Sequence, residues 1–396
     1  MNNDYLLSEI NEIPEIFFNF SKKIPEFVRT FAIPDHDEIW FVGSGDSHCA
    51  ARYGASLFNQ LKKRSIAFSS MELSRFHGFI DEKRPILIAI SVSGKTPRVI
   101  EAVRQFRSHQ PRGHIVALTD NPSSPLYKEA DTQIIIGTSP VSELEFTGKS
   151  NDATKLYDGY HHPIAQTKTF FANILWITVL AHLLCRTESF FPTFFSSFDP
   201  VLRDWISHVY QWTSNNPIRF IDRTIFIGGG LFNSLATFAK YKWFEFTFSA
   251  HDADTEEYAH TSYFITDEKS SLVFFGSTDN HLQRIEELLT GALAILIKPE
   301  TFLLSNELGA ARIAAKWPIS ILRMPVPTEM SSIEREVYSY LLSSVVIFWW
   351  TYHTARSAGL DTNKFRGGKE VERYISGSLQ TIRGSKVLSD GKSIPE

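Results

Sequence analysis

Three hydroxyl side chains that could carry chemistry follow one short apolar segment. Residues 87–90 are all apolar, which is typical of a strand that is buried on both faces. Ser91, Ser93 and Thr96 come next, and Pro97 suits the first turn of a helix, where its missing N–H leaves no hydrogen bond unmade. The hydroxyls are therefore expected to surround a helix N-terminus, where backbone N–H groups and the helix dipole favour an anion.

This spacing predicts a phosphate-binding loop. Gly94 lets the backbone approach a ligand closely, and Lys95 adds a positive charge beside the hydroxyls. The same residues also fit an ordinary strand–turn–helix in which Ser and Thr only cap the helix. The loop by itself leaves both interpretations open.

A second glycine turn precedes this loop in the chain. We expect a strand at residues 38–42, then Gly45, Asp46 and Ser47 in a turn, then a helix over residues 48–61. Such a turn can also face a phosphate, although similar turns often serve only to bring a helix and a strand into close packing.

The surrounding pattern predicts an α/β fold. Further strands near 66–68, 114–119 and 132–137 alternate with helical segments, which is typical of a parallel doubly wound sheet. In such a sheet ligands bind at the carboxyl ends of the strands, and both turns lie at that edge. The two turns can therefore converge on one ligand.

A polar insert at residues 138–163 separates this sheet from a long apolar helix that ends at Cys185. Gln166, Thr167 and Lys168 open that helix and would line the same pocket. A helix cap with a solvated lysine fits these residues as well.

The second half of the chain repeats the plan of the first. The pattern predicts strands at 224–227, 271–275 and 294–298, a glycine turn at 228–230, and helices at 231–246 and 282–289. The fold class is therefore two doubly wound parallel-sheet domains in tandem, flanked by helices. The expected divisions are a helical lead-in at 1–35 that is broken at Pro14, Pro25 and Pro34, a phosphate-binding domain at 36–190, a connection at 186–200, a second domain at 200–358, and a tail at 359–396 that closes on the site.

Composition narrows the function classes. The 396 residues are 43% hydrophobic, enough for two cores, and a net charge of -4 with scattered Lys and Arg argues against a nucleic-acid binder. Cys49 and Cys185 provide no disulfide framework and no metal-site spacing, which favours a reducing, cytoplasmic setting. The apolar runs at 170–185 and 341–350 are short for a membrane span, and the acidic N-terminus is no secretory signal.

Three further residues have side chains suited to acid–base or carbonyl chemistry. Glu245 lies among aromatic residues, where desolvation would raise its pKa, and His260 follows two glutamates. Lys369 lies between glycines and basic residues, and a desolvated lysine amine can form a Schiff base with a sugar carbonyl. Each also fits a plain surface position: a Glu whose head reaches solvent, a lone surface His and a mobile basic tail.

Several of these motifs together resemble one family. Residues 91–96, Ser-x-Ser-Gly-x-Thr, look like the phosphate loop of sugar isomerase (SIS) domains. The motifs at 166–170, 242–245 and 257–260 are similar to the Ser-Thr-Lys-x-Phe, Lys-x-x-Glu and Glu-x-x-His segments of the isomerase half of glucosamine-6-phosphate synthase and its stand-alone deaminase relatives. The resemblance extends from about residue 36 to 372, with Asp46, Lys95 and Thr261-Ser262 departing from the family pattern.

The resemblance implies a role for each candidate residue. Ser47, Ser91, Ser93 and Thr96 would hold a sugar phosphate. Glu245 would move a proton between the first two sugar carbons, His260 would open the ring from across a homodimer interface, and Lys369 would engage the open-chain carbonyl. Gly45, Asp46, Lys95, Gln166, Thr167 and Lys168 would line the pocket.

The expected function is therefore a phosphosugar aldose–ketose isomerase or deaminase acting on an amino-sugar 6-phosphate. Because the sequence shows no glutaminase domain, we expect the chain to use or release free ammonia, or only to isomerise. Neither cofactor nor metal, nucleic acid nor membrane is implied. Two alternatives stay open: a fructosamine-6-phosphate deglycase and a non-catalytic sugar-phosphate sensor that regulates a partner protein.

Overall fold

A computed structural model describes residues 4–32, 34–79, 84–138, 165–187, 190–276, 279–293 and 299–387. The chain divides into two compact units. The serine-loop unit, named for the loop at residues 91–96 (the serine loop), comprises residues 15–188 and 363–396. The glycine-turn unit, named for the glycines at residues 228–230, comprises residues 1–14 and 189–362.

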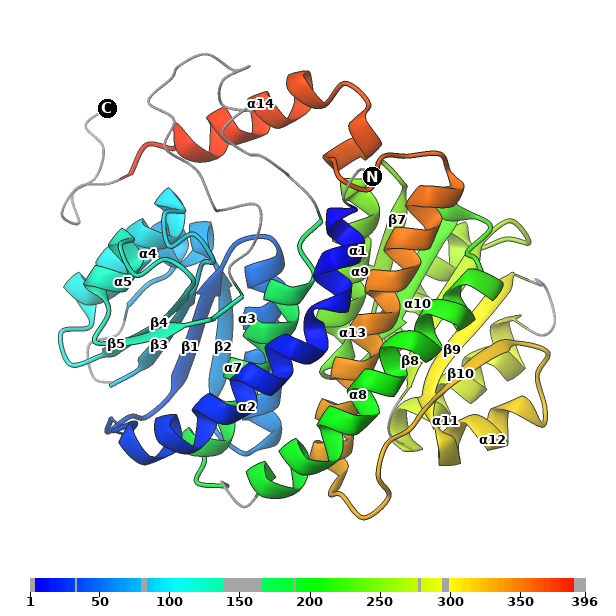
Figure 1. Ribbon diagram of the computed structural model, residues 1–396, viewed down its shortest axis with the longest axis horizontal. Coiled ribbons are helices and arrows are strands. Elements are labelled where there is room, and N and C mark those ends of the chain that lie inside the picture. The colour runs from blue at the N-terminus through cyan, green and yellow to red at the C-terminus, as the bar shows by residue number, and fades with distance from the viewer. Residues whose placement is uncertain are drawn as a thin grey trace. The chain divides into compact units, whose positions relative to one another are not determined.

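The serine-loop unit is built on a sheet of five parallel strands in the order β2-β1-β3-β4-β5 (Figure 1, blue to teal). The strands are β1 (Ile39–Gly43), β2 (Ser65–Ser69), β3 (Ile86–Ile90), β4 (His114–Thr119) and β5 (Thr132–Ile135). Every residue of β1 and β3 is buried, as the apolar runs predict for strands covered on both faces.

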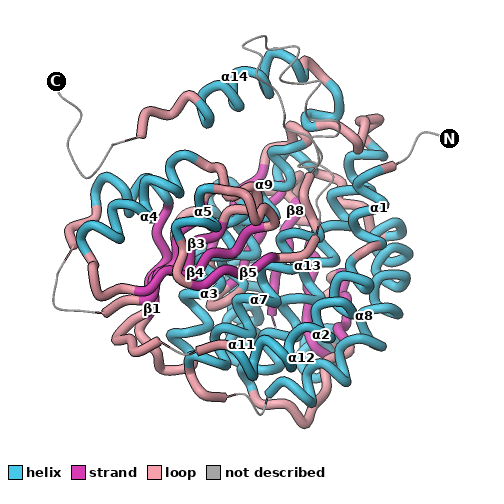
Figure 2. The backbone as a smooth tube through the Cα atoms, turned by 60° about the vertical axis from the view of Figure 1, so that its left-hand side comes forward, coloured by secondary structure: helices cyan, strands magenta, loops and turns pink. Residues whose placement is uncertain are grey.

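Helices cover both faces of this sheet. Figure 2 shows α4 and α5 on one side of the strands and α3 and α7 on the other. The helices of the unit are α2 (Ile13–Thr30), α3 (Asp46–Gln60), a π-helical turn (Glu72–Phe76), α4 (Pro97–His109), α5 (Pro125–Glu129), α7 (Lys168–Leu184), a 3-10 turn (Phe365–Gly368) and α14 (Val371–Arg383). Trp40, Leu87 and Phe106 pack in the core between the sheet and α4, whereas Phe41 packs against Phe58 of α3.

The glycine-turn unit repeats this architecture. Its five parallel strands lie in the order β10-β9-β8-β6-β7 (Figure 1, green to yellow). The strands are β6 (Thr224–Gly228), β7 (Ala250–Ala253), β8 (Ser271–Gly276), β9 (Glu300–Asn306) and β10 (Ser320–Met324). Read from its first strand, each sheet has the same 2-1-3-4-5 order, so the predicted α/β class with two doubly wound sheets is confirmed.

Helices also cover both faces of the second sheet. The helices are α1 (Tyr5–Asn11), α8 (Phe190–Asn215), a 3-10 turn (Ile221–Arg223), α9 (Phe232–Glu245), α10 (Thr255–His260), a 3-10 turn (Ser262–Ile265), α11 (Asp279–Leu288), a π-helical turn (Leu289–Leu293), α12 (Glu307–Ala314) and α13 (Ser332–Ser357). Tyr258, Ile285 and Ile313 pack on one face, and Trp243 of α9 and Trp350 of α13 contact strands on the other.

Several expected boundaries differ from the structure. The helical lead-in breaks between α1 and α2 beside Pro14, as expected, but α2 continues through Pro25, because burial of Phe17 and Ile24 outweighs the hydrogen bond that this proline removes. Helix α8 occupies most of the expected connection at 186–200, and α14 lies within the expected tail. The expected strand at 294–298 lies outside the described residues, as does the polar insert apart from Thr138.

The apolar helix α7 is a core helix. All of its residues are buried, which fits the interpretation of its sequence as internal to a domain. Among the described residues, no helix combines the length and the apolar character that a bilayer crossing requires.

Gly94 fixes the shape of the loop between β3 and α4. Its φ of 61° lies in the left-handed region, and a Cβ added there would lie 2.1 Å from Ser124 Oγ and 2.8 Å from Thr119 Oγ1. The backbone bonds of the loop explain this close approach. Gly94 N donates to Ser91 O at 2.9 Å, and Leu126 N donates to Gly94 O at 3.2 Å.

We predict that Gly94→Ala destabilises the protein by about 2 kcal/mol or more, because the substitution adds both backbone strain and overlap with Ser124. Chemical denaturation of both proteins measures the difference. Gly78→Ala is the matched control, since a Cβ added at Gly78 would meet no atom within 4 Å and its φ is not positive. Equal unfolding midpoints for Gly94→Ala and the parent protein would contradict this account of the loop.

Candidate functional site

The serine loop lies where the strand order of its sheet reverses. The chain passes from β1 outward to β2, then returns to the other side of β1 for β3. In open parallel sheets the crevice at such a switch point, outside the carboxyl ends of the strands, is where ligands bind. The loops after β1 and β3 therefore flank this crevice.

The hydroxyl groups of the serine loop gather at the start of α4. Ser91 Oγ lies 3.0 Å from Thr96 Oγ1, and Ser93 Oγ accepts a hydrogen bond from Lys95 N at 3.2 Å. Ser91 is buried, Ser93 is half-buried and Lys95 is exposed.

The capping interpretation of these hydroxyls does not match the structure. Thr96 is the N-cap residue of α4, yet its side chain accepts no hydrogen bond from the first turn of the helix. Pro97 follows at the first helical position and has no N–H to satisfy. The Thr96 hydroxyl therefore remains within the hydroxyl cluster instead of closing the helix end.

The turn after β1 supplies a second helix N-terminus at the same edge. Gly45 is the N-cap of α3 with φ 55°, and Asp46 and Ser47 are in its first turn. Ser44 Oγ lies 2.6 Å from Ser70 Oγ, which ties this turn to the end of β2. Sequence reasoning missed Ser44 and Ser70, although both directly follow strands.

A histidine in this turn was also missed. His48 follows Ser47 directly, and burial together with the nearby Arg52 lowers the pKa of its imidazole. The ring is therefore held in its neutral form beside the first turn of α3. Its position directly after Ser47 could have indicated a role in this site.

Asp120 links the serine loop to the start of α7. Its backbone N–H donates to Val92 O at 2.9 Å, and its carboxylate accepts hydrogen bonds from the backbone and hydroxyl of Thr138. Thr138 Oγ1 in turn lies 3.2 Å from Thr169 Oγ1, in the first turn of α7. This chain of contacts places the N-terminus of α7 at the carboxyl edge, although no motif in the sequence indicated the role of Asp120.

The three predicted pocket residues at the start of α7 are thus at this edge. Thr167 is the N-cap of α7 and makes no side-chain capping bond, and Gln166 is half-buried. Lys168 is only 2% exposed, so the alternative of a solvated lysine is wrong.

Glu245 belongs to the glycine-turn unit and ends α9. Its Oε1 accepts a hydrogen bond from Lys242 Nζ at 2.7 Å, and the Lys242 side chain is completely buried. Phe238 lies beneath the same ammonium group at 5.0 Å. This contact fixes the orientation of the Glu245 carboxylate beside the buried amine of Lys242.

His260 ends α10 in the same unit. Its Nε2 lies 3.0 Å from Glu256 Oε1, and both side chains are mostly exposed. Glu256 also pairs with Arg284 at 2.7 Å. One carboxylate thus holds the histidine, as its position after two glutamates suggested.

Lys369 belongs to the serine-loop unit, where it is exposed between the 3-10 turn Phe365–Gly368 and α14. Arg366 Nε donates to Lys369 O at 3.1 Å. Arg366 and Glu370 both have positive φ, so the backbone turns sharply on either side of Lys369.

The candidate residues thus fall into two sets. The serine loop, the turn after β1, the start of α7 and Lys369 belong to one unit, and Glu245 and His260 belong to the other. Within the described residues, no group of three or more His, Cys, Asp or Glu side chains is arranged to hold a metal ion.

Comparison with known proteins identifies the family of the region that contains the serine loop. Residues 33–152 match the family model of the SIS domain. A glutamine–fructose-6-phosphate aminotransferase (isomerizing) of Chlamydia caviae is 24% identical over 184 residues, which are 44% of this chain and 27% of that protein. The chain therefore spans about a quarter of the length of this curated relative.

Solved structures resemble the chain over most of its length. The C-terminal domain of glucosamine-fructose-6-phosphate aminotransferase from Francisella tularensis has a TM-score of 0.70 at 16% identity, covering 91% of this chain and 97% of that one. Glucosamine-6-phosphate deaminase from Thermotoga maritima has a TM-score of 0.66 at 19% identity, with the same two coverages. This chain therefore contains a SIS domain at residues 33–152 and has the fold of two SIS domains in tandem.

Proposed function

We propose that this protein is a phosphosugar aldose–ketose isomerase that acts on an amino-sugar 6-phosphate with loss or gain of ammonia. The carrying observation is the hydroxyl cluster of Ser91, Ser93 and Thr96 at the N-terminus of α4, whose N-cap side chain makes no capping bond. In this proposal the enzyme converts glucosamine 6-phosphate and water to fructose 6-phosphate and ammonia, or catalyses the reverse reaction, and it works in the cytoplasm as a homodimer.

A phosphoryl group is the ligand that suits this loop. The helix dipole of α4 places partial positive charge at the loop, and the hydroxyls can donate hydrogen bonds to phosphate oxygens. Lys95 adds a full positive charge, while Asp46 opposes an anion from the neighbouring turn. The two charges offset each other, so the hydroxyls and backbone dipoles supply the net attraction.

The remaining candidates divide the chemistry of the sugar. Glu245 removes the proton from one of the first two carbons and returns it to the other, which exchanges aldose for ketose. The Lys242 ammonium holds this carboxylate in place. His260 donates a proton to the ring oxygen as the ring opens, and Lys369 engages the open-chain carbonyl.

The direct test is turnover by the full chain. Glucosamine 6-phosphate is supplied, and ammonia and fructose 6-phosphate are measured together. We expect both products in equal amounts, and unphosphorylated glucosamine should give neither because it lacks the group that the serine loop holds. A well-folded sample that converts no amino-sugar or ketose phosphate would remove this assignment.

A second prediction concerns Ser93. Ser93→Ala should weaken binding of the sugar phosphate about tenfold, since one hydrogen bond to a charged group contributes roughly 1.5–3 kcal/mol. Calorimetric titration with fructose 6-phosphate measures the change. Ser108→Ala is the control, because Ser108 lies at the other end of α4 and bonds only locally. Unchanged affinity in Ser93→Ala would exclude this hydroxyl from the phosphate site.

A third prediction separates chemistry from binding. Glu245→Gln should slow solvent deuterium exchange into the substrate by at least a hundredfold, because an amide cannot accept the proton. Its affinity for fructose 6-phosphate should stay within about twofold. Glu268→Gln, at an exposed position of the same unit, serves as the comparison, and it should retain exchange. Persistent exchange in Glu245→Gln would show that another group is the base.

A further inference from the structure

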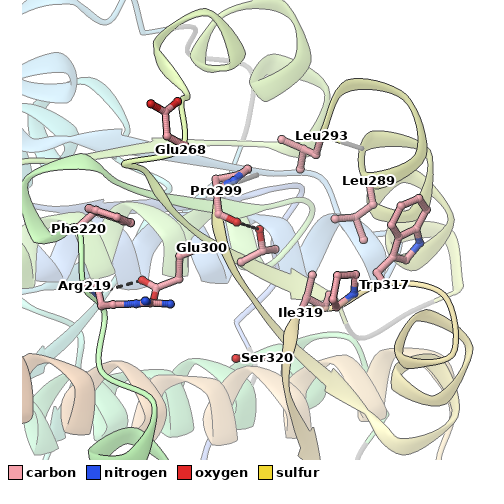
Figure 3. A pocket seen from close by; sticks show the side chains of 12 residues that line it. Arg219, Phe220, Glu268, Leu289, Leu293, Pro299, Glu300, Trp317, Ile319 and Ser320 are labelled. Atoms are coloured by element: carbon pink, nitrogen blue, oxygen red, sulfur yellow. Dashed lines mark hydrogen bonds and ion pairs between the residues drawn. The ribbon is translucent and has the colours of Figure 1, made fainter. Parts of the chain in front are cut away.

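A separate cavity of about 600 Å³ lies wholly within the glycine-turn unit (Figure 3). Its lining includes Glu300 and Ser320, which begin β9 and β10, and Arg219, which precedes β6. The cavity is therefore at the amino edge of the second sheet. Ligands that undergo chemistry in such sheets bind at the opposite edge, so the cavity is distinct from any site at the carboxyl ends.

One end of the cavity holds a fixed guanidinium group. Glu300 accepts hydrogen bonds from Arg219 Nε at 2.7 Å and from Arg219 N at 3.0 Å, and also from Ser271 Oγ at 2.6 Å. The Glu300 side chain is 9% exposed and that of Arg219 is 72% exposed. Among the described residues, neither terminal nitrogen of Arg219 has a hydrogen-bond partner.

This arrangement prepares Arg219 for an anion. An exposed arginine normally loses much rotational freedom when it binds a ligand. Here one carboxylate already holds the backbone N–H and Nε of Arg219, so part of that entropy is lost on folding. The two terminal nitrogens of the guanidinium can donate to one carboxylate in a bidentate geometry.

The other end of the cavity is apolar. Figure 3 shows Leu289, Leu293 and Trp317 grouped on the side away from Arg219, with Ile319 below them. Leu289 and Leu293 belong to the π-helical turn after α11 and are almost completely buried. This apolar end suits a ring system or a branched hydrocarbon.

We propose that this cavity binds a small monocarboxylic acid with an aromatic or branched apolar body. The carboxylate pairs with the terminal nitrogens of Arg219, and the body packs against Leu289, Leu293 and Trp317. A single negative charge fits better than two, because Glu300 already neutralises Arg219 and the exposed Glu268 adds negative charge at the rim. The site is independent of the sugar-phosphate loop.

The test is calorimetric titration of the full chain with three probes of one shape. They are 2-naphthoate, its neutral amide 2-naphthamide, and the cation 2-naphthylmethylamine. We expect one 2-naphthoate per chain, bound at least tenfold more tightly than the amide, because its carboxylate forms a charge-assisted pair with the guanidinium. The amine should bind more weakly than either. Tightest binding by the amine would overturn the proposal and assign the polar end to Glu268.

Two variants and one control variant locate the site. Arg219→Met should abolish the preference for 2-naphthoate over 2-naphthamide, and Arg203→Met should retain it, because Arg203 pairs with Asp199 on α8 outside the cavity. Ser320→Asp leaves the Arg219–Glu300 pair intact and adds a carboxylate to the wall, so it should weaken 2-naphthoate at least tenfold and spare the amide.

Sugar-phosphate affinity should be the same in all three variants, which separates this site from the proposed function. Equal 2-naphthoate binding by the parent chain, Arg219→Met and Ser320→Asp would refute the proposal. So would the absence of any binding to the folded parent chain.

Discussion

The structure depends most on one constraint: a hydroxyl-lined turn must fit between two buried parallel strands and the first turn of α4. The left-handed backbone at Gly94 permits this fit, because any side chain there would overlap Ser124. The turn then positions Ser91 beside Thr96 and leaves the N-cap side chain out of the helix end. A helix end arranged this way can attract an anion without a metal ion or a cluster of basic residues.

The two sheets share a strand order but differ in what their loops carry. The first sheet has hydroxyl groups on the loops after β1 and β3, on both sides of its switch point. The second has two glycines, Gly229 and Gly230, directly after β6 and a paired carboxylate, Glu245, at the far end of the following helix. The proposed function assigns binding of the phosphate to the first unit and acid–base chemistry to Glu245 and His260 of the second.

The sequence predicted the features that rest on local rules. The apolar run at 87–90 and Pro97 located β3 and the start of α4, and the alternation of strands and helices predicted both sheets. It did not predict that α2 would pass through Pro25, because the burial of Phe17 and Ile24 depends on tertiary packing. It also could not show that Asp120 connects the serine loop to α7, since that link joins residues from three loops far apart in the chain. The burial of Lys168 could not be predicted from the sequence either, because a lysine at the start of a helix is usually solvated.

The most direct test of the central claim is a crystal structure of the full chain with glucosamine 6-phosphate bound. The account predicts that the phosphate lies against the hydroxyls of Ser91, Ser93 and Thr96, within hydrogen-bonding distance of backbone N–H groups at the start of α4. A sugar phosphate bound elsewhere, with this loop empty, would contradict it.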